Sequence, residues 1–124
     1  MSFIAILQEM VEGVDGGIGA ALMGSDGIAI AEWMSPGARE RSSLEEVASA
    51  GVEFGRVLDE IRKVADVLGG GALKETVISL ARLIFIFRGV ADDAFLVMAL
   101  VPEANLGRAR YLVRCSLSAL QEEL

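Results

Sequence analysis

The chain has 124 residues, of which 53% are hydrophobic, and a formal net charge of −7. This length predicts one domain, residues 1–124, that can bury a core of its own. The acidic balance argues against a nucleic-acid partner, because binding to a phosphate backbone depends on clustered lysine and arginine. Histidine is absent and Cys115 is the only cysteine, which excludes the commonest general base, the commonest metal ligand and an internal disulfide.

Two further features bear on where the chain works. Charged residues interrupt every apolar stretch before it reaches the roughly 20 residues of a membrane helix, so we expect no direct membrane insertion. The first residues lack the basic segment, apolar run and cleavage site of a secretory signal. We therefore expect a cytoplasmic protein, and its mean hydropathy of +0.51 predicts apolar surface that a partner covers.

The first elements in chain order are a short helix and a hairpin. Apolar residues at helical spacing over residues 3–14 predict the helix, and Gly13 begins the turn that ends it. Residues 18–23 and 27–33 predict two antiparallel strands. Asp26 and the glycine after it provide the backbone conformation that a tight turn between them requires.

A long amphipathic helix follows over residues 43–68. Ser43, with Glu46 three residues later, forms a capping-box pattern at its start, and Gly69 begins a glycine run that ends it. Two apolar stripes run along this helix, and a helix with two apolar faces needs two surfaces to pack against. The bulky stripe consists of Val47, Ala50, Phe54, Val57, Ile61, Val64 and Leu68, and the small-residue stripe of Leu44, Ala48, Gly51, Gly55, Leu58 and Ala65.

We expect the bulky stripe to pack on the chain's own sheet and the small-residue stripe to contact a second copy. Gly51 and Gly55 lie on one face of the helix, where a missing Cβ lets another backbone approach closely. The alternative is that both stripes form one wide face that packs on the chain's own core. The rest of the helix surface is a charged arc of both signs that includes Glu46, Glu53, Arg56, Glu60 and Lys63.

Three more strands and a helix complete the chain. Residues 73–80, 82–88 and 94–101 predict the strands, with a turn between the last two. The first of these strands is the most polar, so we expect it at an edge of the sheet. Pro102 ends the last strand, and Asn105 can cap the final helix.

The order of these elements predicts an α+β fold. We expect a five-stranded antiparallel sheet with one long helix on one face and the two terminal helices on the other, in the order α-β-β-α-β-β-β-α. A twofold dimer would cover the free face of the long helix and pair the edge strand with its symmetry mate. The expected dimer contacts are Leu44, Ala48, Gly51, Gly55, Leu58, Thr76, Val77, Ile78 and Ser79.

Three patterns that resemble catalytic or nucleotide-binding motifs are better explained by structure. Residues 69–76 lack the glycine directly before Lys74 that a phosphate-binding loop requires. Asp92 and Asp93 lie in a predicted turn, where adjacent side chains point to opposite faces. Cys115 has no histidine to activate it, so we expect a buried or half-buried helix residue. We predict no catalytic residue, no cofactor and no metal site.

The loop after the second strand carries residue types that are enriched at protein interfaces. Trp33 ends the strand, and Arg39 and Arg41 follow it. Aromatic residues and arginine often anchor protein partners. We interpret this segment as a partner contact; the alternative is a tryptophan that covers the end of the sheet, with the arginines in water.

The chain also resembles a known family. The resemblance is carried by residues 17–22 running into 25–30, by residues 92–97 and by residues 105–110. In this order they are similar to Roadblock/dynein-light-chain domains, nearest to the free-standing bacterial members that regulate a Ras-like small GTPase. The resemblance spans nearly the whole chain and implies dimerisation through the long helix and the adjacent edge strand.

The resemblance implies a homodimeric, non-enzymatic regulator or scaffold that binds a Ras-like small GTPase and can modulate its GTP hydrolysis. The family has no catalytic residue to carry over. The alternatives are a structural adaptor of a larger assembly and a small-molecule sensory domain. The expected partner-binding residues are Trp33, Arg39, Arg41, Glu46, Glu53, Arg56, Glu60 and Lys63.

Overall fold

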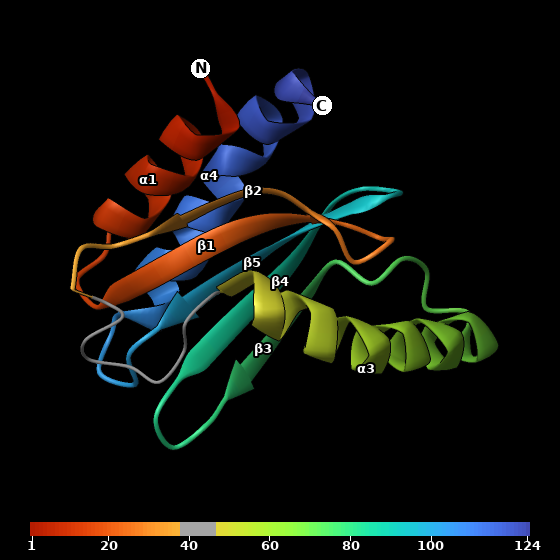
Figure 1. Ribbon diagram of the computed structural model, residues 1–124. Helices are drawn as coiled ribbons and strands as arrows, with labels where there is room; N and C mark the ends of the chain where they lie inside the picture. Colours follow the sequence, from red (N-terminus) through yellow and green to blue (C-terminus); the bar gives the residue numbers. More distant parts are fainter. Residues whose placement is uncertain (38–46) are drawn as a thin grey trace.

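The computed structural model describes residues 1–37 and 47–124, and its elements follow the expected order (Figure 1). The predicted start of the long helix at Ser43 lies outside the described residues. The elements are α1 (Phe3–Glu12), β1 (Gly17–Gly24), β2 (Ala29–Met34), α3 (Val47–Leu68), β3 (Glu75–Ser79), β4 (Ile84–Ala91), β5 (Ala94–Leu100) and α4 (Leu106–Glu123).

The sheet has five strands in the order β2-β1-β5-β4-β3, and all neighbouring strands are antiparallel. The expected fold class is confirmed. Strand β3 lies at one edge, as its polar composition predicts, and β2 lies at the other. Every residue of the central strand β5 is buried.

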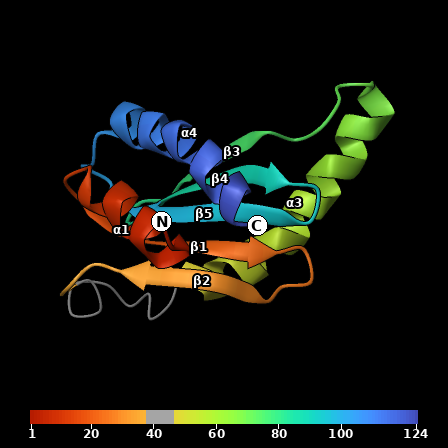
Figure 2. The same ribbon diagram turned by 90° about the horizontal axis from the view of Figure 1, so that it is seen from above.

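The helices cover the two faces of the sheet as predicted. Helices α1 and α4 pack together on one face, and α3 lies on the other, with its C-terminal end clear of the sheet (Figure 2). A hydrophobic core lies on each face of the sheet. Alternate residues of β5 pack in one core or the other, because successive side chains of a strand point to opposite faces. Leu96 and Met98 pack under α1 and α4, whereas Phe95 and Val97 pack under α3.

The turns and caps agree with the predictions made for them. The Asp26 carboxylate accepts a hydrogen bond from the Ile28 N–H at 3.0 Å and closes the β1–β2 turn. Asn105 caps α4, where its side-chain oxygen accepts from the Arg108 N–H at 3.0 Å. Gly69 adopts a φ of 67° just after the last residue of α3, which ends the helix as its glycine run predicts.

The predicted strand boundary that differs most from the structure is the end of β4. Strand β4 continues to Ala91 instead of ending at Arg88, and only Asp92 and Asp93 remain for the turn. An irregularity in the β4–β5 register accommodates Val90, whose side chain is 4% exposed. Burial of this valine explains why the strand extends through a segment that its glycine predicts as a turn.

The assignment of the two α3 stripes is also wrong. The small-residue stripe packs on the chain's own sheet, and the bulky stripe leaves it after Phe54. In the small-residue stripe, Ala48, Gly51 and Leu58 are buried and Gly55 and Ala65 are half-buried; Leu44 lies outside the described residues. In the bulky stripe, Val57, Ile61, Val64 and Leu68 are exposed.

The reason lies in the size of the sheet's side chains. A Cβ on Gly51 would lie 3.0 Å from Met23 Cγ and 3.3 Å from its Sδ. Beyond this point Phe54 packs on Phe85, with ring centroids 5.3 Å apart. At Gly51 the Met23 side chain fills the interface, so a small residue of the helix faces it, whereas Phe54 and Leu58 fill the wider gap further along the helix.

Leucine substitutions at Gly51 and at Gly55 should have different effects on stability. We expect Gly51→Leu to lower the free energy of unfolding by about 1–3 kcal/mol, because it overpacks the contact with Met23. A Cβ on Gly55 meets only Phe95 Cζ, at 3.8 Å, so Gly55→Leu should be neutral or stabilising. Urea denaturation of both variants measures the difference. Equal destabilisation by the two leucines would show that α3 does not pack as described.

Candidate functional site

The most prominent exposed feature of α3 is the outer part of its bulky stripe. Val57, Ile61, Val64 and Leu68 are 51%, 38%, 57% and 77% exposed. They recur every three or four residues and therefore lie on one face of the helix. A continuous apolar face of this kind in contact with solvent is typical of a protein-interaction site. We call these four residues the exposed stripe.

Strand β3 forms an open edge of the sheet, and its Ile78 packs in the core under α3. Thr76, Val77, Ile78 and Ser79 pair with β4, and among the described residues no strand pairs with their other side. Val77 and Ser79 are exposed. An edge strand with unpaired backbone groups can accept a strand from another chain. Contact of these four residues with a second copy stays a prediction.

The charged arc of α3 is exposed, and its described members are paired with one another. Arg56 contacts Glu53 at 2.8 Å and Lys63 contacts Glu60 at 3.0 Å, each one helical turn apart. Exposed pairs of this kind stabilise a helix by roughly 0–1 kcal/mol. A partner can therefore replace them at little cost. Glu46 belongs to the predicted arc but lies outside the described residues.

Trp33 is not placed beside this arc. Its side chain is half-buried and packs on the core under α1 and α4, on the opposite face of the sheet from α3. This position agrees with the alternative in which the tryptophan covers the end of the sheet. Arg39 and Arg41, predicted as its neighbours in a partner contact, lie outside the described residues.

An ion-pair cluster joins the edge strand to α4. Both Glu75 carboxylate oxygens accept hydrogen bonds from Arg110, at 2.7 and 3.0 Å, and Arg88 lies 4.0 Å from Glu75. The hydrogen bond from Arg110 lowers the pKa of Glu75; burial opposes this effect, and the charges of Arg110, Arg88 and Arg114 add to it. Two parallel bonds fix the orientation of both groups. The cluster therefore holds Glu75, the first residue of β3, against α4.

The remaining candidate sites hold no catalytic arrangement. Lys74 is followed by strand β3, not by the helix of a phosphate-binding loop. Cys115 is exposed, which corrects the expectation that it is buried or half-buried. Within residues 1–37 and 47–124, no group of three or more acidic or cysteine side chains could hold a metal ion. No helix in these same ranges has the length and apolar character needed to cross a membrane.

Solved structures share this fold. MglC from Myxococcus xanthus is 30% identical to the chain, each chain is covered over 100% of its length, and the TM-score is 0.69. A Roadblock/LC7 domain from Streptomyces avermitilis gives a TM-score of 0.80 at 14% identity, with 98% of this chain and 97% of that one covered. The gliding protein MglB from Thermus thermophilus gives 0.84 at 18% identity, with 97% and 86% covered.

These similarities define the class of the protein: it has the fold of the Roadblock/LC7 domains. The chain belongs to this family, since its identity with MglC extends over the full length of both chains. The resemblance inferred from the sequence is thereby confirmed. No protein-family model matches the chain, and no curated protein matches it.

The sequence reasoning missed the exposed stripe as a candidate interface. Its residues were recognised as an apolar stripe but assigned to the chain's own core. The signal that could have corrected this is the size of Met23 on the facing strand, which a small helix residue such as Gly51 complements better than a large one.

The ion-pair cluster generates a pH-dependent prediction. Because the folded-state pKa of Glu75 is lowered, its contribution to stability is present above the unfolded-state pKa of about 4.3 and is lost as the pH falls through the lower folded-state value. We expect Arg110→Gln to lower the urea midpoint at pH 7, and the deficit to shrink below about pH 4. Arg114→Gln is the control and should change the midpoint less. A deficit that persists unchanged at acid pH would contradict this role of the pair.

Proposed function

We propose that the protein is a homodimeric, non-enzymatic regulator or scaffold that binds a Ras-like small GTPase. Two observations support the dimer: the exposed stripe of α3 and the open edge of β3. Each is a feature that a soluble chain usually covers. One twofold operation can cover both, because a residue that contacts its partner is contacted in return.

The proposed dimer contacts differ from those expected from the sequence. The helix contribution is the exposed stripe, Val57, Ile61, Val64 and Leu68, because Ala48, Gly51 and Leu58 are buried between α3 and the sheet of one chain. The strand contribution stays Thr76, Val77, Ile78 and Ser79. Fully burying a valine, isoleucine or leucine side chain contributes about 1.5–3 kcal/mol, so the exposed stripe of two copies is large enough to stabilise association.

A Ras-like small GTPase is the partner that the family resemblance implies. The charged arc supports a polar protein partner, because Glu53, Arg56, Glu60 and Lys63 are exposed and paired only along their own helix. We place the regulator among the proteins that act by binding, without a catalytic residue of their own. A structural adaptor differs from it in one measurable respect: its partner binds equally well whichever nucleotide is present.

Charged substitutions in the exposed stripe test the proposed dimer. We expect the double variant Ile61→Glu, Val64→Glu to be a folded monomer, because two carboxylates would have to be buried in the interface. Light scattering coupled to size exclusion gives the mass, and circular dichroism reports the fold. Ile4→Glu is the matched control, since Ile4 is also exposed but lies on α1. If the double variant stays dimeric, the exposed stripe is not part of the dimer interface.

The charged arc is tested by charge reversal. We expect Glu53→Lys with Glu60→Lys to weaken capture of a small GTPase from the same genome by about tenfold or more, the equivalent of ~1.4 kcal/mol. Titration calorimetry with the GTPase bound to GDP or to a GTP analogue measures this and shows any dependence on nucleotide. Glu9→Lys with Glu12→Lys, on α1, is the control of equal charge. Unchanged binding by the arc variant would remove the arc from the interface.

A further inference from the structure

A hollow opens between α3 and the sheet beyond Gly51, on the side of the helix that faces away from the exposed stripe. After its close approach at Gly51, α3 runs away from the sheet, and residues 69–74 return to β3 (Figure 1). The hollow has a volume of about 810 Å³, within the range of about 300–1,000 Å³ that is usual for ligand sites. Residues of the turns after β1 and β4 also line it.

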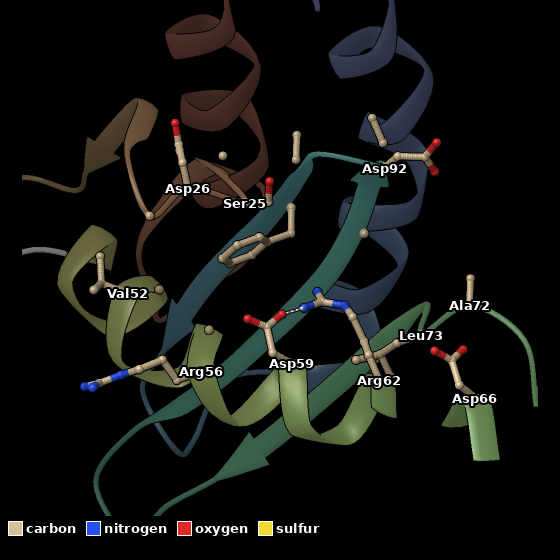
Figure 3. A pocket seen from close by; sticks show the side chains of 18 of the residues that line it. Ser25, Asp26, Val52, Arg56, Asp59, Arg62, Asp66, Ala72, Leu73 and Asp92 are labelled. Atoms are coloured by element: carbon tan, nitrogen blue, oxygen red, sulfur yellow. Dashed lines mark hydrogen bonds and ion pairs between the residues drawn. The ribbon is translucent and has the colours of Figure 1, made fainter. Parts of the chain in front are cut away.

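The base of the hollow is apolar. Gly55 of α3 and Phe95 of β5 line it, together with Val52 of α3 and Leu73 before β3 (Figure 3). Val52 is 43% exposed, so an apolar side chain can reach it. Since the glycine at position 55 carries no side chain, a bound group can lie directly against the helix backbone.

The rim of the hollow is acidic. Asp26, Asp59, Asp66 and Asp92 line it, together with Arg56 and Arg62. Both arginines already have carboxylate partners: Arg62 contacts Asp59 at 2.6 Å and Arg56 contacts Glu53 at 2.8 Å. Within the described part of the chain no ion pair joins Asp66 or Asp92. The hollow therefore favours a cationic occupant and repels phosphate groups, anionic lipids and a second copy of a chain with a net charge of −7.

The shape of the hollow is elongated. Its α3 wall extends from Gly51 to Asp66, and fifteen steps of 1.5 Å along a helix give about 23 Å. An extended peptide advances about 3.3–3.6 Å per residue, so roughly six residues span this wall. Figure 3 shows Asp26 and Asp66 at opposite ends of the hollow. Acidic groups at both ends and an apolar base between them fit a chain with separated positive charges better than a compact molecule.

We propose that this hollow binds a linear segment of a partner protein that alternates basic and apolar residues. The apolar side chains lie against Val52, Gly55 and Phe95, and the basic ones reach Asp66 at one end and Asp26 and Asp92 at the other. The exposed stripe takes no part in lining the hollow. The site therefore stands independently of the proposed dimer and adds a second partner surface to the same helix.

The test uses fluorescein-labelled hexapeptides of alternating leucine and lysine or leucine and glutamate, titrated with the full chain and followed by fluorescence anisotropy. We expect the lysine peptide to bind saturably and the glutamate peptide not to bind. Asp66→Lys with Asp92→Lys should weaken binding of the lysine peptide by about tenfold or more. Glu103→Lys with Glu122→Lys makes the same change in net charge on exposed residues outside the hollow and should have little effect.

A second variant tests the apolar base without changing charge. Gly55→Leu fills the hollow and should abolish peptide binding, while Ser49→Leu, at an exposed position of the same helix, should not. Thermal melting of both variants checks that they are folded. Three results would overturn the proposal. The first is that Asp66→Lys with Asp92→Lys weakens binding no more than Glu103→Lys with Glu122→Lys. The others are full peptide binding by Gly55→Leu, and binding of spermine without binding of the lysine peptide.

Discussion

The close contact between Gly51 and Met23 determines how α3 lies on the sheet. A Cβ at position 51 would lie 3.0 Å from Met23 Cγ, in a side chain that is fully buried, so glycine lets the helix and the strand approach without displacing it. The contact fixes the N-terminal half of α3 and leaves the other half to diverge.

Because α3 diverges from the sheet after Gly51, the helix presents three different surfaces. The outer side of α3 presents Val57, Ile61 and Val64 to solvent, the side nearest the sheet borders a hollow with an acidic rim, and the charged arc lies between them. Apolar and charged groups are thus separated around one helix. A helix that carries distinct faces can bind more than one partner at a time, which is the property that a regulator or scaffold needs.

Much of the fold was predictable because local rules agree with one another. The Asp26 turn, the Asn105 cap and the alternating burial of β5 each depend on contacts a few residues apart or on strand periodicity. The face of α3 that packs on the sheet was not predictable in this way. Helical spacing identifies two stripes but not which one the sheet accepts; that choice depends on Met23 and the phenylalanines of strands distant in sequence.

The central claim is that one chain leaves the exposed stripe uncovered and a second copy covers it. Sedimentation equilibrium of the unmodified protein over a dilution series tests this most directly. The account predicts a mass of twice 13.1 kDa that falls toward the single-chain value on dilution. A mass of one chain at every concentration, in a folded protein, would contradict it.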